Sequence, residues 1–245
     1  MKNSLNKSQI ERFSRQLVLK NIGPKGQKKI LSSKVLIVGI GGLGCPAAEN
    51  LVRAGIGTIG LIDNDTVNLS NIHRQSLFNS KDIKKPKVNV AAKKLKEINP
   101  LTIIKTYKSR LNQNNINQII KNYEIIIDGT DNFKTKFLIN DYCLKYKKKL
   151  VTGAISKFDG HIFTFNFKDN KTASLKSFYQ ENEISDNDLN CEFEGVLGTT
   201  ASIVGTTQAN EALKMIMKIG QTLKNQILII DLLNLNFRKV KFNRK

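Results

Sequence analysis

The stretch 35-VLIVGIGGLGCP-46 joins a run of four apolar residues to the glycine-rich segment Gly39-x-Gly41-Gly42-x-Gly44. An apolar run followed by closely spaced glycines is typical of a buried strand that turns directly into a helix. Such a turn places backbone N–H groups and the positive end of a helix where a phosphate group can bind. The stretch therefore predicts a nucleotide-binding α/β fold, and it leaves open whether the nucleotide is NAD(P) or ATP.

Outward from this stretch, apolar runs alternate with helical segments. We expect strands at 34–39, 58–63, 102–107, 124–128 and 149–155, and helices at 45–55, 87–99, 115–123 and 132–147. The expected strands are continuously apolar, as in a parallel sheet that has helices on both faces. The alternating segment 161–167 predicts an antiparallel strand, which a polar crossing loop at 168–190, a helix at 198–220 and two closing strands follow.

The predicted fold class is α/β, a Rossmann-like, doubly wound, mostly parallel sheet with an antiparallel C-terminal extension. We expect a single domain over 1–245, with an N-terminal helical arm at 1–33, a nucleotide-binding core at 34–160 and the extension at 161–245. A chain of 245 residues is long enough to bury one large core.

The composition argues against several classes of protein. The net charge is +20, but the lysines are spread along the chain and accompany many Asn and Ile residues. We interpret this charge as compositional bias and do not predict nucleic-acid binding. No apolar run predicts a membrane span, and the N-terminus lacks the apolar stretch of a signal peptide. Cys45, Cys143 and Cys191 show no disulfide or C-x-x-C spacing, so we expect a reducing, cytoplasmic setting.

Charged residues downstream of the glycines favour ATP over a redox dinucleotide. Asp63 ends the second expected strand, where a carboxylate can bind ribose hydroxyls. Arg74 and Lys87 offer two cations for phosphate oxygens, and Asp131 in 128-DGTDN-132 offers a carboxylate for Mg²⁺. Taken singly, each could be a solvated charge or, for Asp131, a helix cap. Their joint placement after strands predicts a triphosphate and metal site, and nothing comparable suits a nicotinamide ring.

Five segments in this order resemble one family. They are GIGGLG (39–44), DNDTVNLSNIHRQ (63–75), KPK (85–87), DGTDN (128–132) and NCEFEGVLGTTASIVGTTQANEALK (190–214). Together they are similar to the HesA/MoeB/ThiF family, whose members are relatives of ubiquitin-activating enzymes. The family adenylates the C-terminal glycine of small β-grasp sulfur-carrier proteins. The resemblance extends from about Arg12 to the final expected strand.

The resemblance implies an enzyme, an adenylyltransferase that uses ATP and Mg²⁺. It implies a ThiS- or MoaD-like carrier, thiamine or molybdopterin synthesis, and a sulfurtransferase as a further partner. The residues implied to contact the nucleotide, its phosphates or the metal are Gly39, Gly41, Gly42, Gly44, Asp63, Ser70, Asn71, Arg74, Lys87, Asp131 and Asn132. Arg15, in 12-RFSRQ-16, would reach into the site of a neighbouring subunit, which implies a homodimer. In the chemistry, Arg15, Arg74, Lys87 and Mg²⁺ at Asp131 would neutralise the anionic reactants.

Two features depart from the family or extend beyond adenylation. Many members hold a structural zinc on two C-x-x-C pairs, but this chain has 174-SLKS-177 at the first position and 241-KFNRK-245 at the second. Because serine hydroxyls are poor zinc ligands, we expect no zinc. Cys191 matches a cysteine that some members link covalently to the carrier, so it is a candidate sulfur-transfer thiol. Its acidic neighbours Glu192 and Glu194 would raise the thiol pKa.

Three other functions stay open on the sequence. The chain could adenylate another carboxylate, such as that of a modified tRNA base or a peptide. It could be a catalytically silent carrier-binding scaffold, although the intact Arg74, Lys87 and Asp131 argue against this. It could also be an NAD(P)-binding oxidoreductase, which would bind NAD more tightly than ATP.

Overall fold

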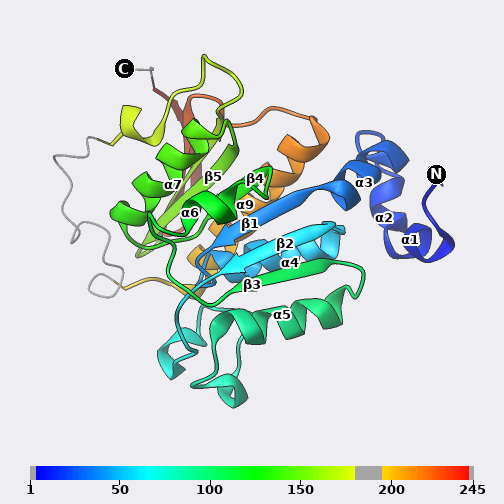
Figure 1. Ribbon diagram of the computed structural model, residues 1–245. Coiled ribbons are helices and arrows are strands. Elements are labelled where there is room, and N and C mark those ends of the chain that lie inside the picture. The colour runs from blue at the N-terminus through cyan, green and yellow to red at the C-terminus, as the bar shows by residue number, and fades with distance from the viewer. Residues whose placement is uncertain (1–3, 180–194, 243–245) are drawn as a thin grey trace.

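The computed structural model describes residues 4–179 and 195–242, and its centre is one eight-stranded sheet in the order β3-β2-β1-β4-β5-β6-β7-β8 (Figure 1). The strands are β1 (Lys34–Val38), β2 (Thr58–Ile62), β3 (Ile103–Tyr107), β4 (Ile125–Asp128), β5 (Lys149–Ser156), β6 (Asp159–Asn166), β7 (Gln226–Asp231) and β8 (Asn236–Lys241). The helices are α1 (Lys7–Arg12), α2 (Ser14–Leu17), α3 (Gly23–Ser32), α4 (Gly44–Ala54), α5 (Lys87–Ile98), α6 (Ile116–Ile120), α7 (Phe133–Lys145) and α9 (Gly198–Met217). Short 3-10 turns are η1 (Leu69–Asn71), η2 (Ser80–Asp82) and η3 (Leu175–Ser177).

The sheet has a parallel half and an antiparallel extension. Strands β3, β2, β1, β4 and β5 run parallel to their neighbours, with β1 in the middle of that half. Strands β6, β7 and β8 add to β5 in antiparallel pairs. The predicted fold class, a doubly wound and mostly parallel sheet with an antiparallel C-terminal extension, is therefore confirmed.

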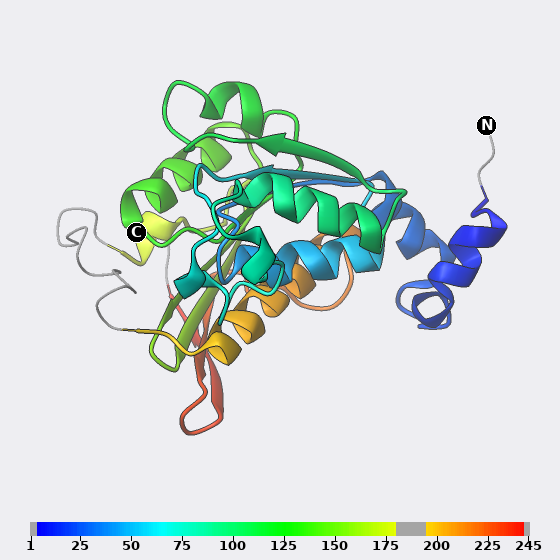
Figure 2. The same cartoon turned by 90° about the horizontal axis from the view of Figure 1, so that it is seen from below.

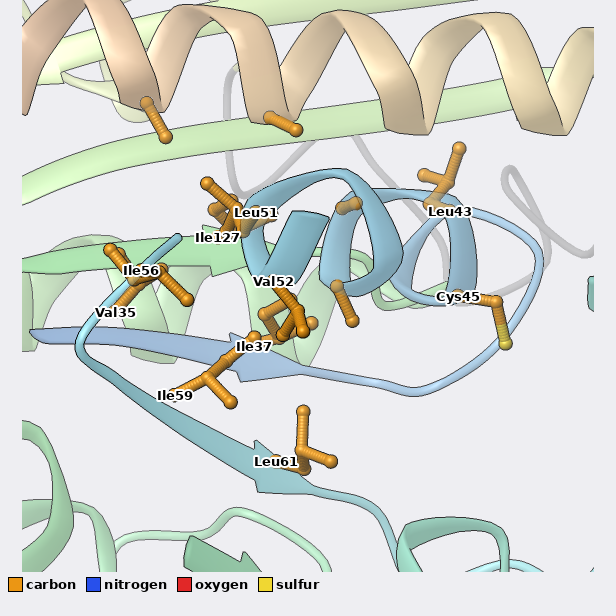
Figure 3. Packing of buried hydrophobic residues seen from close by; sticks show 14 of the residues in the cluster. Val35, Ile37, Leu43, Cys45, Leu51, Val52, Ile56, Ile59, Leu61 and Ile127 are labelled. Carbon is orange, nitrogen blue, oxygen red and sulfur yellow. The ribbon is translucent and has the colours of Figure 1, made fainter. Parts of the chain in front are cut away.

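The two faces of the parallel half are buried under different helices. Val35 and Ile37 of β1 belong to a core that includes residues of α4, α5 and α9. Leu36 and Val38 point to the opposite core, which includes residues of α6 and α7. Figure 2 shows α4, α5 and α9 together on one side of the sheet, and Figure 3 shows the side chains of α4 above β1 and β2. The continuous apolar character of β1 follows from this burial on both faces.

Several helices are shorter than the sequence predicts. The segment predicted as a helix over 115–123 forms only α6, because beyond Ile120 the N–H groups of Asn122 and Tyr123 donate to carbonyl oxygens three residues back and the α-helical pattern is lost. The helix predicted over 198–220 ends at Met217, because Lys218 adopts a left-handed conformation with φ of 60°. No helix within the described ranges has both the length and the apolar character needed to cross a bilayer.

The first part of the predicted crossing loop, 168–179, is attached to the rest of the protein. The N–H of Ala173 donates to Oδ1 of Asn225 at 2.9 Å, and the N–H of Leu175 donates to Oδ1 of Asn140 at 3.0 Å. Leu175 is buried in the core beneath α7. These residues form the predicted loop, interrupted only by η3, and the loop is attached to Asn225 and to α7. The remainder of the loop lies outside the described residues.

Candidate functional site

A cavity of about 870 Å³ lies at the carboxyl ends of the parallel strands. Residues that follow β1, β2 and β4 border it, including Gly39, Asp63 and Gly129. Side chains from the segment between β2 and α5 and from the start of α7 complete its walls. In an open α/β sheet this edge, at the point where the strand order reverses, is where ligands bind.

The glycine turn between β1 and α4 divides into structural and cavity-facing positions. Gly39 has a φ of 85°, and a Cβ added at Gly44 would lie 1.9 Å from the carbonyl oxygen of Gly39. Gly44 therefore allows α4 to start directly against the end of β1, and it does not border the cavity. Gly41 and Gly42 do border it, and in the described residues their N–H groups meet no acceptor. Those free donors at the start of α4 suit an anionic ligand.

Asp63 ties the end of β2 to the glycine turn. Its Oδ2 accepts the N–H of Ile40 at 2.7 Å, and its Oδ1 accepts the N–H of Asp65 at 2.8 Å. Burial raises the pKa of Asp63 above the ordinary value, and the charge of Lys87 and the two N–H groups offset part of that shift. The carboxylate borders the cavity and keeps further lone pairs, so it can accept hydrogen bonds from ribose hydroxyls.

The segment after β2 brings Arg74 to the cavity. The guanidinium donates from Nη1 to the carbonyl oxygen of Ser70 at 2.8 Å, and the same nitrogen lies 2.6 Å from Nε2 of His73. Asn71 is buried, and its Oδ1 caps the turn by accepting the N–H of Asn68 at 3.1 Å. Ser70, Asn71 and Arg74 all border the cavity, as the sequence predicts. The turn η1 thus holds the guanidinium of Arg74 at the wall of the cavity, where its planar set of donors can bind a phosphate.

Lys87 is the second cation of the site, and it is almost completely buried. Only 5% of Lys87 is exposed, and its Nζ lies 3.0 Å from Oδ2 of Asp65. The Lys87 backbone N–H also donates to the carbonyl oxygen of Asp65, at 3.0 Å. Asp65 therefore holds the buried ammonium group of Lys87 at the cavity. Lys87 is not an exposed surface lysine.

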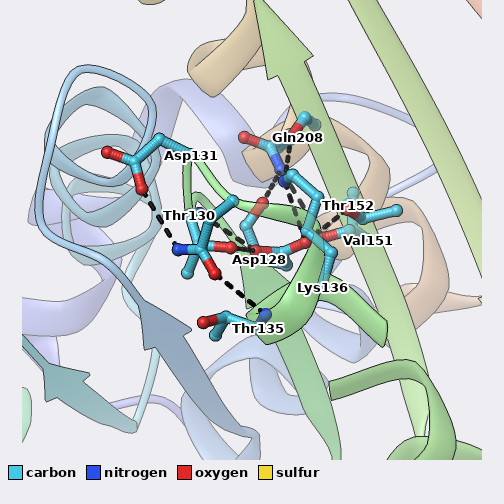
Figure 4. A network of polar contacts seen from close by, with 10 residues as sticks. Asp128, Thr130, Asp131, Thr135, Lys136, Val151, Thr152 and Gln208 are labelled. Carbon is cyan, nitrogen blue, oxygen red and sulfur yellow. Dashed lines mark hydrogen bonds and ion pairs between the residues drawn. The ribbon is translucent and has the colours of Figure 1, made fainter. Parts of the chain in front are cut away.

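The loop after β4 presents one carboxylate that is held by many donors and one that is not. Asp128 accepts from the side chains of Lys136, Thr130 and Thr152 (Figure 4). Asp131 is exposed at the cavity and, within the described residues, has no ion pair; Nδ2 of Asn132 lies 3.3 Å from its Oδ1. Asn132 caps α7 by accepting the N–H of Thr135 at 2.9 Å. Asp131 is therefore the carboxylate available to a cation.

One predicted site residue, Arg15, lies away from the cavity. Arg15 is exposed on α2, which Figure 1 places beside α3 at the opposite end of the sheet from the cavity, so Arg15 does not reach the site of its own chain. Cys191 lies outside the described residues. Cys45 and Cys143 are buried, and burial raises the pKa of the Cys45 thiol to about 12 and that of Cys143 well above its ordinary value. Both are packing residues and poor nucleophiles.

Ser174 and Ser177, which stand where many family members have the first C-x-x-C pair, form a helix cap. Ser177 Oγ accepts the N–H of Ser174 at 3.2 Å, and the two hydroxyl oxygens lie 3.5 Å apart at the start of η3. Within the described residues no cluster of three or more His, Cys, Asp or Glu could hold a metal. The absence of zinc remains a prediction, and elemental analysis of protein purified without chelator tests it. One zinc per chain would contradict it.

The cavity also contains functional candidates that the sequence reasoning missed. Asp65, Gln75, Arg110 and Lys136 border it. Gln75 is buried, and its Oε1 has no hydrogen-bond partner in the described part of the chain. Arg110 follows the end of β3, so the rule that located Asp63 after β2 would have found it. Gln75 and Lys136 carry no comparable local signal, because their placement depends on packing between distant segments.

Comparisons with known proteins give the family. A model of the ThiF family matches residues 13–245. The chain is 38% identical over 238 residues to the probable molybdopterin-synthase adenylyltransferase of Gracilaria tenuistipitata var. liui, covering 97% of this chain and 66% of that protein. It is 36% identical to the sulfur carrier protein adenylyltransferase of Thermus thermophilus, covering 97% of this chain and 89% of that protein.

A comparison of folds agrees with the strand order. The crystal structure of MccB from E. coli with ATP superposes with a TM-score of 0.85 at 21% identity, over 98% of this chain and 73% of that one. The β1–α4 glycine turn, the carboxylate after β2 and the cavity at the carboxyl ends of the strands occur in a chain that the family model matches over nearly its whole length. The chain belongs to the ThiF family.

Proposed function

We propose that this chain adenylates the C-terminal carboxylate of a small sulfur-carrier protein of the ThiS or MoaD kind, in thiamine synthesis, molybdopterin synthesis or both. Membership of the ThiF family and the names of the two relatives, both adenylyltransferases, support this proposal. The observation that carries the proposal is that the cations Arg74 and Lys87 and the carboxylates of Asp63 and Asp131 border the same cavity as the glycine turn, whose N–H groups at Gly41 and Gly42 are free in the described residues.

The charges of the site suit this reaction. A carboxylate oxygen of the carrier bonds to the α-phosphorus of ATP, and the bond from that phosphorus to the bridging oxygen breaks. Pyrophosphate leaves with the electron pair. Because both reactants are anions, the protein must mainly neutralise them and align them, which Arg74 and Lys87 would do. No general base is needed, because a carboxylate is already ionised near neutral pH.

Magnesium fits the residues present. Mg²⁺ in proteins typically takes one or two carboxylates and completes its shell with substrate phosphates and water. Asp131 would hold it, with Asn132 adjacent, since Asp131 is the carboxylate of this cavity that faces no cation or group of donors among the described residues. When bound, the ion would supply positive charge to the phosphates. Asp65 and Asp128 are already paired with lysines.

We further propose a homodimer in which Arg15 of each copy completes the cavity of the other. Mixing separately purified Arg15→Ala and Arg74→Ala proteins tests this, because subunit exchange would create dimers in which one cavity has both arginines. Recovery of activity on mixing is expected, up to about a quarter of the wild-type value if exchange is random. No recovery, although the two proteins form mixed dimers, would remove Arg15 from the site. A sulfurtransferase partner and a sulfur-transfer role of Cys191 belong to a later step and stay proposals.

The adenylation itself is tested by exchange of labelled pyrophosphate into ATP with Mg²⁺ and, in turn, a ThiS-like and a MoaD-like carrier. Exchange that depends on one carrier is expected, and the same carrier without its final glycine is the matched control. Exchange with both would assign both pathways. No exchange with either, despite ATP binding, would contradict the proposal and point to another carboxylate or to a silent scaffold. Tighter binding of NAD than of ATP would point to an oxidoreductase.

A further inference from the structure

A buried ion pair lies beneath the loop that carries Asp131. Asp128, the last residue of β4, is 1% exposed, and Lys136, one turn into α7, is 2% exposed. The Lys136 Nζ lies 3.1 Å from Oδ2 of Asp128 and donates to the carbonyl oxygen of Gly153 in β5 at 2.6 Å. A charge pair buried this completely costs desolvation energy, which an apolar pair of similar volume would avoid.

The Asp128 carboxylate joins the segments around that loop. Thr152 of β5 donates its hydroxyl to Oδ2 at 2.5 Å, and Thr130 donates its N–H and its hydroxyl to Oδ1 at 2.9 and 2.6 Å. The backbone oxygen of Asp128 accepts from Nε2 of Gln208 in α9 at 2.8 Å. Figure 4 shows these contacts converging on Asp128, with Asp131 on the outer side of the loop. The neighbouring strand, the following helix and the loop itself are therefore fixed to one residue.

The ion pair closes the turn from β4 to α7 into a ring. Asp128 and Lys136 are eight positions apart in the sequence, and Asp131 lies between them. Asp128 is not among the residues that border the cavity, so its carboxylate does not face a ligand there, whereas Asp131 does. The ring holds both ends of the loop while leaving the carboxylate of Asp131 exposed. A site is preorganised when hydrogen bonds and ion pairs of neighbouring residues hold a functional group in place before the ligand binds.

We propose that Asp128, Lys136 and Thr152 are positioning residues, which orient Asp131 toward the metal and triphosphate. The inference rests on the proposed function only in assigning Asp131 to the metal–nucleotide complex. It adds three residues that would act through the Asp128 carboxylate: Asp128 and Thr152 do not border the cavity, and Lys136, which borders it, is paired with Asp128. A merely structural role would give a different result, in which loss of a contact lowers the melting temperature and leaves metal binding unchanged.

The decisive variant is Thr152→Val, which removes one hydrogen bond to Asp128, keeps the shape of the side chain and leaves the ion pair in place. Lys136→Arg is the conservative exchange, because a guanidinium keeps the charge and several donors. Lys136→Met removes the charge and leaves Asp128 buried without its cation, so we expect this variant to be strongly destabilised. Lys145→Met, on the exposed end of the same helix, is the matched control.

Binding of Mn²⁺ to the protein–ATP complex, followed by electron paramagnetic resonance, measures the proposed effect without a carrier. For Thr152→Val we expect about a tenfold weaker Mn²⁺ affinity, the effect of one hydrogen bond to a charged group. The rate of pyrophosphate exchange at saturating ATP should fall by a similar factor, with little change in KM for ATP. Lys136→Arg should restore most of the affinity that Lys136→Met loses, and Lys145→Met should behave as wild type.

Unchanged Mn²⁺ affinity in folded Thr152→Val, with only a lower melting temperature, would overturn the proposal, and it would do so even if Lys136→Met does not fold. If wild-type protein binds Mn²⁺ and ATP but exchanges no pyrophosphate with any carrier, the proposed function fails and the positioning roles are still decided by the Mn²⁺ series. The two failures are therefore distinguishable.

Discussion

The parallel half and the antiparallel extension of the sheet use their residues for different purposes. In the parallel half, all four residues of β4 are buried, and the cavity lies at the carboxyl ends of the strands. In the extension, every residue of β8 is exposed, and Arg238, Lys239 and Lys241 lie along this edge strand. Charges on an open edge discourage pairing with another chain. The cavity thus lies in the half whose central strands, β1, β2 and β4, are buried on both faces.

A cluster of aromatic rings packs on the antiparallel extension. Phe163 of β6 packs edge-on against Phe178, Tyr179 and Phe242, with ring centroids 5.0 to 5.9 Å apart. Aromatic contacts of this kind stabilise beyond the area they bury. From this comparison we expect substitutions in the parallel half to affect ligand binding and activity at the cavity. Substitutions in the extension should mainly lower the free energy of unfolding.

The largest effect should come from Gly44→Ala in the parallel half. The new methyl group would meet the carbonyl oxygen of Gly39 at 1.9 Å, so β1 and α4 could not both keep their positions. We expect a loss of several kcal/mol, enough to leave little folded protein. The matched control is Gly41→Ala, where the nearest atom would be Nε2 of Gln75 at 3.8 Å. Circular dichroism melts compare the two, and equal stability of both variants would contradict the assigned role of Gly44.

The second effect concerns chemistry and leaves the fold intact. Arg74→Ala should lower pyrophosphate exchange by about a thousandfold, because an arginine that stabilises a phosphoryl-transfer transition state contributes at least this much. Arg74→Lys should recover a small part, since one ammonium cannot make the paired contacts of a guanidinium. Arg53→Ala, which removes an exposed ion pair with Glu49 on α4, is the control and should leave the rate unchanged. Near-normal turnover in folded Arg74→Ala would remove Arg74 from the catalytic residues.

Much of the parallel half could be predicted from the sequence, because its signals are local. Continuous apolar runs indicate strands buried on both faces, and residues after such strands must meet at one edge, so Asp63, Arg74 and Asp131 were found. Contacts between residues that are far apart in the sequence could not be predicted in this way. Asp65 holds Lys87 from 22 positions away, and Asn140 and Asn225 fix the polar segment 168–179 from 35 and 52 positions away. A polar stretch looks irregular when the partners of its backbone are distant in the chain.

A smaller, purely structural effect is expected at Asn225 in the extension. Its Oδ1 accepts the N–H of Ala173, its Nδ2 donates to the carbonyl oxygen of Lys171 at 3.2 Å, and its φ is 52°. Asn225→Ala loses both bonds and places a Cβ in a left-handed conformation that Asn tolerates better. We expect about 1–3 kcal/mol of destabilisation in urea unfolding.

The matched variant Asn225→Gly separates the two causes. Glycine relieves the backbone strain but lacks the side-chain bonds, so its cost should be smaller than that of alanine. Calorimetry should give the same ATP affinity for both variants and for wild type, since Asn225 does not border the cavity. A large loss of ATP affinity in folded Asn225→Gly would break the division between the two halves of the sheet.

The smallest effect is a pH dependence that arises at His161 of β6. Burial lowers the pKa of His161 below its ordinary value of 6.5; Asp159 opposes this shift and Arg238 adds to it. A histidine whose pKa is lower in the folded state gives stability that is present above its unfolded pKa and is lost as the pH falls through its folded pKa. We therefore expect the urea midpoint to decrease as the pH is lowered from 7.5 toward 5. His161→Gln should reduce that decrease, and the lowered pKas of Asp169 and Asp231 should leave it intact, because they act at more acidic pH. An identical pH dependence in wild type and His161→Gln would show that burial of this imidazole in the extension carries no titration cost.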